Sequence, residues 1–403
     1  MSTASLSLYS GLYFSRIPSY SAELHPDEHR LVGPALQRPS ADFVKHSKSG
    51  GLSLRLGAQV EGAATPMFAA RTPVEGIVEI AKPEGLAVVA VKIEGRIKLH
   101  EFAEGGTMTV VLCNESIPLW RKGEDAGPCP SALPFSTLLP MTFVLEDATY
   151  PLPPTFAAQL EGIPGFSANV EYTVTAFTSK TKTVVLGIGE TTVSTPFIYR
   201  PLTRPTPGLQ ETAEWRAHES TILMRSPGAE DESIMCKLYV PRSHVYCLAR
   251  PIPFHIAFVG SATLLPTLLA HMLSPTGEAP SMASTSIQVV RQATVSVKTQ
   301  SVPTAMTMWH IFSIGEGSIH RTGHGAGWAA FSGELNVNSD ETVGDFDAGC
   351  LWVKDCIVFT VTPTDAVKGP MKNTRIVIPI RLVTNPFEKE PDELYNQEKP
   401  DAK

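Results

Sequence analysis

Charged residues are scarce in this sequence. Only 18% of its 403 residues are Asp, Glu, Lys or Arg, whereas 34 are proline and 30 are glycine. Long surface helices need polar faces rich in Lys and Glu, and proline and glycine interrupt them. The same two residues favour turns between short strands. The composition therefore predicts a β-rich protein, and the length predicts two domains, at roughly 100 to 200 residues each.

An excess of basic residues is also missing, because the formal net charge is -7 at pH 7. Binding to nucleic-acid phosphates needs clustered Lys and Arg side chains. We therefore do not expect nucleic acid to be a partner of this protein.

The chain lacks a long apolar run. Its most apolar stretch, Leu264–Leu273, contains Pro266 and His271 and is far shorter than the roughly 20 residues of a membrane helix. Residues 1–20 are interrupted by Ser and Gly and carry a single basic residue, Arg16, which is not typical of a secretory signal or a mitochondrial transit peptide. We expect a cytoplasmic protein with no transmembrane segment.

Motifs for catalysis and metal binding are absent as well. The sequence contains no G-x-S-x-G, H-E-x-x-H or phosphate-loop motif, and His320 and His324 stand in a glycine-rich run without a carboxylate nearby. No C-x-x-C occurs, so we expect the six cysteines to be reduced and mostly buried. The sequence predicts no enzyme, no cofactor and no metal. A site assembled from scattered residues is the alternative.

The clearest positive signal is an alternation of apolar and charged residues over Val89–Leu99. The odd positions are Val89, Val91, Ile93, Ile97 and Leu99, and the even positions include Lys92, Glu94, Arg96 and Lys98. Successive side chains of a strand point to opposite faces of its sheet. The pattern predicts a strand with one face in a core and one face in water.

Further β signals recur along the chain, most of them bounded by Gly, Pro, Asn or Asp. They lie at Thr107–Cys113, Phe143–Glu146, Val170–Phe177, Thr183–Ile188, Met235–Val240, Ile252–Val259, Ser286–Lys298, Met306–Ile314, Cys350–Thr362 and Arg375–Val383. Short strands without regular intervening helices favour antiparallel sandwiches over a parallel sheet. We expect Thr267–Ala283 and Gly315–Gly333 to be long loops.

The expected organisation is all-β, with two tandem antiparallel immunoglobulin-like sandwiches. Residues 1–51 form a tail that contributes at most one edge strand, residues 52–200 the first sandwich, and residues 223–386 the second. Residues 201–222 form a linker, since four prolines between Pro196 and Gly208 stiffen the chain and cannot donate sheet hydrogen bonds. Residues 387–403 form a charged, disordered tail.

Lys92, Arg96 and Lys98 are the candidate partner-binding residues. The alternation places all three on the water-facing side of one strand, where they could contact phosphorylated or acidic partners. The alternative is that they are ordinary solvated charges that prevent aggregation of the sheet.

Several short motifs, taken in order, resemble the arrestin family, and within it fungal α-arrestin-like proteins. In the first half, Phe143–Leu145, Tyr150–Phe156 and Asn169–Thr175 resemble a strand, a Leu-Pro-Pro-Ser-Phe-like turn and a Tyr-bearing strand of the arrestin N-terminal domain, and Pro196–Pro205 resembles its exit. In the second half, Leu238–Arg242 with Pro251–Ile256 and Leu351–Phe359 with Ile376–Thr384 resemble the opening and closing strands of the C-terminal domain. The resemblance covers residues 52 to 385 and implies the arrestin fold.

The resemblance also implies a function. Proteins of this kind are adaptors that bind cytoplasmic tails of membrane-protein cargo or trafficking partners, in endocytosis or ubiquitin-dependent sorting, and they are recruited to the plasma membrane or endosomes. The family recruits ubiquitin ligases through PPxY motifs, and this chain has none, since its nearest segment is Pro153–Phe156. The alternative is a constitutive, retromer-like scaffold subunit of a trafficking complex.

Overall fold

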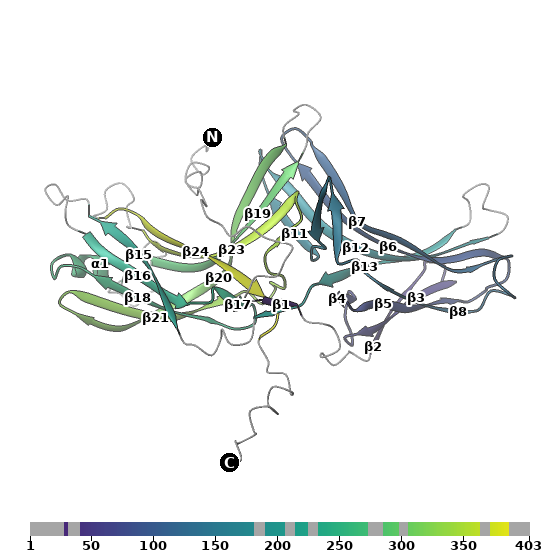
Figure 1. The fold of residues 1–403 in the computed structure, drawn as a ribbon, viewed down its shortest axis with the longest axis horizontal. Helices are drawn as coiled ribbons and strands as arrows, with labels where there is room; N and C mark the ends of the chain where they lie inside the picture. Colours follow the sequence, from purple (N-terminus) through teal and green to yellow (C-terminus); the bar gives the residue numbers. More distant parts are fainter. Residues whose placement is uncertain are drawn as a thin grey trace, which may run out of the picture.

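The computed structural model describes residues 28–30, 41–180, 190–205, 214–224, 233–272, 285–297, 305–362 and 371–386. Within these ranges the protein consists of β-strands and one helix, α1 (Leu264–Met272). The strands form two halves that lie side by side (Figure 1). The predicted all-β fold with antiparallel sandwiches is confirmed, and the predicted strand at Thr183–Ile188 lies outside the described residues.

The first half consists of two facing sheets. One has the order β4-β13-β12-β6-β7, with β11 added beside β12, and the other has the order β2-β3-β5-β8. The strands of the first sheet are β4 (Met67–Ala69), β6 (Leu86–Glu101), β7 (Thr107–Arg121), β11 (Phe156–Leu160), β12 (Phe166–Lys180) and β13 (Thr191–Arg200). Those of the second are β2 (Ala41–His46), β3 (Leu52–Gln59), β5 (Pro73–Ile80) and β8 (Ala132–Leu138).

Two small strand pairs lie outside these sheets. The hairpin of β9 (Thr142–Leu145) and β10 (Ala148–Pro151) is antiparallel, as is the pair of β1 (Glu28–Arg30) and β14 (Thr203–Pro205). The pair that contains β14 contacts the second half, where Thr203 hydrogen-bonds Thr384. Strands β1 and β2 both lie within residues 1–51, so this segment supplies two short strands where we expected one at most.

The second half is one ten-stranded sheet. Its order is β15-β16-β18-β21-β20-β19-β23-β24-β17, with β22 beside β23. The strands are β15 (Trp215–Leu223), β16 (Ser233–Pro241), β17 (Val245–Cys247), β18 (Ile252–Val259), β19 (Thr285–Val297), β20 (Met306–Gly325), β21 (Trp328–Val337), β22 (Phe346–Asp347), β23 (Leu351–Val361) and β24 (Thr374–Val383). The sheet curls until β15 approaches β24. Just before β24, the Lys372 backbone N–H donates to the Leu223 carbonyl at 2.8 Å, and Met224 and Met371 form an isolated antiparallel β-bridge.

The predicted facing of the strands is confirmed. In β6 the side chains of Val89, Val91, Ile93 and Ile97 are at most 1% exposed, and Tyr172 of the neighbouring β12 is 1% exposed. The Tyr172 hydroxyl donates to the Pro153 carbonyl at 2.6 Å, which satisfies its one polar group inside the core.

The core of the first half contains residues of the second half. Ala293, Val295 and Val297 of β19 and Leu351 and Val353 of β23 belong to the same buried cluster as the apolar residues of β6 and β12. In Figure 1, β19 and β23 accordingly reach up beside β11, β12 and β7. A second cluster fills the interior of the ten-stranded sheet. The two halves are therefore joined by shared apolar packing, and the predicted domain limits stay predictions.

The expected loop at Gly315–Gly333 is wrong, because this segment forms the antiparallel hairpin of β20 and β21. Its glycines make room for a side chain. A Cβ added at Gly325 would lie 2.5 Å from Trp328 Nε1, and one at Gly323 would lie 2.9 Å from the Trp328 ring, so the indole packs over two glycines of the partner strand. An aromatic ring that covers glycine in this way stabilises a paired strand.

Two further expectations need correction. The segment Thr267–Ala283 is not a loop throughout, because it begins inside α1, and its residues 273–284 lie outside the described ranges. The proline-rich run starts inside β13, where Pro196 faces Thr173 of β12. On its other side, β13 pairs with β4 only over Ile198–Arg200. Pro196 therefore has a neighbouring strand on one side only, where a missing backbone N–H is tolerated. Part of the predicted linker 201–222 is likewise β-structure, namely β14 and most of β15.

Candidate binding surfaces

The structure places the three predicted site residues on one surface. Lys92, Arg96 and Lys98 lie on the outer face of β6, and their side chains are 37%, 45% and 50% exposed. The sequence alternation therefore located these side chains correctly. Whether they contact a partner stays a prediction.

Each of the three cations is paired with a carboxylate. Glu94 accepts from Lys92 Nζ at 2.9 Å and from Arg96 at 2.6 Å, and Glu171 of β12 lies 2.6 Å from Lys98 Nζ. The hydrogen bond from Lys92 is the strongest influence on Glu94 and lowers the pKa of its carboxyl. A face with three cations and two anions, all partly solvated, attracts a phosphate only weakly.

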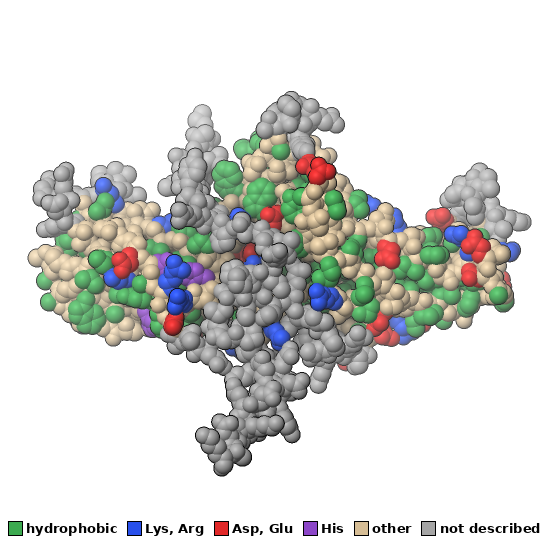
Figure 2. Space-filling view, viewed as in Figure 1, with side chains coloured by type: hydrophobic (Ala, Val, Ile, Leu, Met, Phe, Trp, Pro, Cys, Tyr) green, Lys and Arg blue, Asp and Glu red, His purple; other side chains and the backbone are tan. Residues whose placement is uncertain are grey.

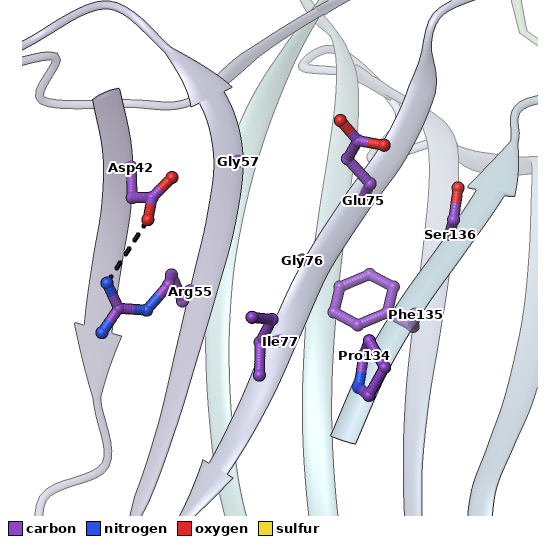
Figure 3. A pocket seen from close by; sticks show the side chains of 9 residues that line it. All are labelled: Asp42, Arg55, Gly57, Glu75, Gly76, Ile77, Pro134, Phe135 and Ser136. Carbon is purple, nitrogen blue, oxygen red and sulfur yellow. Dashed lines mark hydrogen bonds and ion pairs between the residues drawn. The ribbon is translucent and has the colours of Figure 1, made fainter. Parts of the chain in front are cut away.

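A more distinctive surface lies on the other sheet of the first half. A hollow of about 510 Å³ opens on the outer face of β2-β3-β5-β8 (Figure 3). Its lining comes from all four strands and consists of Asp42, Arg55, Gly57, Glu75, Gly76, Ile77, Pro134, Phe135 and Ser136. Sequence reasoning missed this surface, because it forms only when four strands pair in the right register and the fourth, β8, is more than 50 residues from β5 along the chain.

One outward-facing glycine, Gly57 of β3, keeps the floor of the hollow low. Gly76 of β5 lies on the core-facing side, like Val74 and Val78, and a Cβ there would lie 2.2 Å from the Arg55 carbonyl oxygen and 3.1 Å from the buried Phe135 ring. Gly57 has no such clash and simply leaves space above the strand. The hollow is thus in part a consequence of a missing side chain in β3.

An ion-pair cluster lies at one side of the hollow. The Arg55 guanidinium lies between Asp42, at 3.3 Å, and Glu79, at 2.9 Å. The hydrogen bond to Glu79 is the largest of the effects that raise the pKa of Arg55. Glu75 also belongs to the lining. On the face of the molecule drawn in Figure 2, side chains of both charges are interspersed among apolar ones.

A buried charge cluster lies where the two halves meet. Arg291 of β19 has a side chain with no exposed surface and binds Asp355 of β23 through Nε at 2.8 Å and a second nitrogen at 2.9 Å. It also donates to Glu341 at 2.7 Å and to the Val343 carbonyl at 2.8 Å. Burial opposes the charge of Arg291, but Asp355 and Glu341 outweigh burial and raise its pKa.

The cluster fixes the segment 338–347, which contacts the first half. Arg200 of β13 donates to the Thr342 carbonyl at 2.8 Å, and the rings of Phe156 and Phe346 pack edge to face at 5.3 Å. Arg291 therefore anchors an element that joins the halves, and its partners are all internal. Sequence reasoning missed this cluster, because Glu341 and Asp355 are separated from Arg291 by many residues.

The cysteines are free, as expected, and all but the half-buried Cys113 are buried. Burial raises the pKa of Cys113 and Cys350 to about 11 and that of Cys236 and Cys356 to about 12. Thiols with such pKa values carry almost no thiolate at neutral pH. Within the described ranges, no three His, Cys, Asp or Glu side chains are grouped so that they could hold a metal ion.

The chain matches no protein-family model and no curated protein. The resemblance to arrestins therefore stays a prediction. Across the described part of the chain, no helix has the length and apolar character needed to cross a bilayer.

Proposed function

We propose that this protein is a non-enzymatic, arrestin-like adaptor that binds extended segments of other proteins, namely cytoplasmic tails of membrane proteins or trafficking partners. The observation that carries the proposal is the hollow on the outer face of β2-β3-β5-β8. Such a surface, open and crossed by strands, suits an extended peptide better than a small molecule, which is normally enclosed.

The edge of the same sheet supports this role. Strand β2 pairs with β3 on one side, and within the described residues no strand pairs with its other side. An edge of this kind can accept a further strand through backbone hydrogen bonds, while neighbouring pockets select side chains. The hollow reaches this edge strand, because Asp42 of β2 belongs to its lining.

The shared core supports a role in holding partners at fixed positions. Apolar residues of β19 and β23 pack inside the first half, and Arg291 anchors the segment that contacts it. Surfaces on the two halves are thereby kept at a constant separation. This rigidity also favours the second candidate, a constitutive scaffold subunit of a trafficking complex.

Proximity labelling with the full chain in its native cell tests the adaptor proposal. We expect enrichment of membrane proteins, coat components or ubiquitin-system components, and we expect the variant Gly57→Val, which fills the hollow, to lose that enrichment. The matched control is Thr109→Val on β7, away from the hollow. A partner set without any of these classes would contradict the proposal.

Gel filtration of the cell extract separates the two candidates. A transiently binding adaptor elutes mostly alone, whereas a scaffold subunit elutes in a stable stoichiometric complex that survives dilution.

A further inference from the structure

We propose that the free edge of β20, in the second half, accepts an extended segment of a partner as an added strand, and that this segment alternates carboxylate and apolar side chains. The inference rests on the proposed function, because it names a second surface through which the adaptor would bind such segments, but it does not involve the hollow. It follows from an unpaired strand edge, an arginine without a carboxylate partner and an exposed indole.

The free edge is the part of β20 that extends past β19. Strand β20 pairs with β21 over Gly315–Gly325, whereas β19 pairs with β20 only as far as Glu316. A Cβ at Gly317 would lie 2.5 Å from Ile287 of β19, so β19 still covers that position. Over Ser318–Gly325, no strand of the described part pairs with the other side of β20. Such an edge carries backbone N–H and C=O groups that an added strand can bind.

A bulge sets the two faces of this edge. The register of β20 against β21 shifts between Arg321 and Gly323, so β20 carries one extra residue there. Arg321 pairs with Phe331 and His324 pairs with Ala329, and both of these partners are buried in the core. Directly paired side chains lie on the same face of a sheet. The bulge therefore brings Arg321 and His324 to one face, where both are exposed at the strand edge.

Arg321 provides a cation for an acidic partner. Within the described ranges it makes no ion pair with an Asp or Glu side chain. Glu334 of β21 pairs with Ser318 on the opposite, outer face, so it does not neutralise Arg321. A guanidinium presents a planar set of N–H donors that matches a carboxylate, and His324 on the same face adds a nitrogen for a hydrogen bond. A carboxylate of an added strand would therefore meet Arg321.

The same side chains argue against a second copy of this chain as the added strand. Two such edges, paired with each other, would bring two copies of Arg321 close together, and like charges on paired strands are destabilising. A charge that points inward at an edge is one of the ways in which proteins prevent such self-association. It does not oppose a segment with carboxylates at the matching positions.

The outer face of the edge is apolar. The Trp328 indole packs over Gly323 and Gly325 of β20 and is 48% exposed. On the same face, Val259 pairs with Trp328 on one side and with Met235 on the other, and Val259 and Met235 are 46% and 42% exposed. Contiguous exposed apolar side chains mark surfaces that bind other proteins. An apolar side chain of the added strand would lie against the indole.

Fluorescence anisotropy with labelled synthetic peptides and the full chain tests the inference. Neighbouring side chains of a strand point to opposite faces, so one peptide alternates Glu with Val and a second alternates Lys with Val. We expect the Glu peptide to bind, with an affinity that falls as salt is added. The Lys peptide should bind about tenfold more weakly or worse, because the charge-assisted hydrogen bonds to Arg321 are lost.

Backbone methylation tests whether the segment binds as a strand. Methylating alternate backbone nitrogens of the Glu peptide gives two further peptides, and only one of them keeps the N–H groups that face β20. We expect that peptide to bind and the other to lose binding.

A charge reversal locates the binding. Arg321→Glu should reverse the preference, so that the Lys peptide binds and the Glu peptide does not. Because this variant gains binding of the Lys peptide, a misfolded protein cannot produce the expected result. The matched control is Lys372→Glu, which makes the same change at an exposed lysine before β24 and should leave the preference for the Glu peptide unchanged.

The outcomes separate this inference from the proposed function. If Arg321→Glu leaves binding of the Glu peptide unchanged and Gly57→Val abolishes it, the peptide lies in the hollow, so the proposed function stands and this inference is overturned. Equal binding of the Glu and Lys peptides, or of the two methylated peptides, overturns it as well. If neither peptide binds, the inference is wrong and Arg321 only protects the edge, whereas the proposed function is still tested by proximity labelling with Gly57→Val.

Discussion

Arg291 is the residue on which the junction of the two halves depends most. Its side chain and that of Asp355 are both fully buried and share two hydrogen bonds. Arg291→Met leaves Asp355 as a buried charge without its partner, so we expect a loss of about 3–5 kcal/mol of unfolding free energy. Denaturant unfolding followed by fluorescence measures it.

The double variant Arg291→Met, Asp355→Leu is the control for this prediction. Replacing both partners by apolar groups removes the fully buried unpaired charge, and Glu341, whose side chain is 22% exposed, can be hydrated, so most of the lost stability should return. A single variant as stable as the unchanged protein would show that the cluster does not hold the junction.

A histidine pair makes stability depend on pH. His218 Nε2 and His244 Nε2 are 3.3 Å apart. Burial, followed by His218 and Arg216, lowers the pKa of His244 to about 4, and burial also lowers the pKa of His218 from its usual 6.5. The folded protein therefore holds both rings neutral, while the unfolded chain takes up their protons below pH 6.5.

This depression of the pKa fixes the sign of the pH effect. The contribution to stability is complete above pH 6.5 and is lost as pH falls from there toward 4. We expect the melting temperature of the unchanged protein to fall over that window. The melting temperature of the His244→Asn variant should fall less steeply. Equal slopes for the two proteins would mean that the pair does not stay neutral in the folded state.

At the scale of single elements, the alternation in β6 gives a sharp test of facing. Ile93→Asp places a charge in the core of the first half and should unfold it, at a cost of several kcal/mol. Lys92→Asp, one position away on the outer face, should change stability far less. Circular dichroism melting of both variants measures this contrast, and similar melting of the two would refute the assigned faces.

Elements with a strict two-residue period could be predicted from the sequence, because alternation reports which face of a strand is buried. For this reason β6, β12 and β24 were located, along with the outward position of Lys92 and its neighbours. The hairpin at Gly315–Gly333 could not be predicted, because a glycine has no side chain that would show which face of a strand is buried. Here Gly323 and Gly325 leave room for Trp328, which packs against them from the neighbouring strand.

The candidate sites, too, could be predicted from the sequence only in part. Each cation of the predicted site could be placed on its strand, but Glu171, the partner of Lys98, comes from another strand whose register the sequence does not reveal. The hollow needs the register of four strands at once. Its only sequence signal is the alternation in β5, which places Glu75, Ile77 and Glu79 on one outer face.

At the scale of the whole molecule, the shared core predicts cooperative unfolding. Val295 and Val353 come from the second half but belong to the core of the first. Truncating both to Ala should destabilise the protein by about 1 kcal/mol or more per site and shift a single transition in calorimetry. Two separate transitions, of which only one moves, would contradict the shared core.

The central claim is that the hollow on β2-β3-β5-β8 binds segments of partner proteins, and site-specific photo-crosslinking in the native cell tests it most directly. A photoreactive amino acid at Ser136, which lines the hollow, should capture extended segments of membrane-protein tails or trafficking partners. The same group at Thr109, exposed on β7, should not. Capture of no partner at Ser136, or of the same partners at both positions, would contradict the claim.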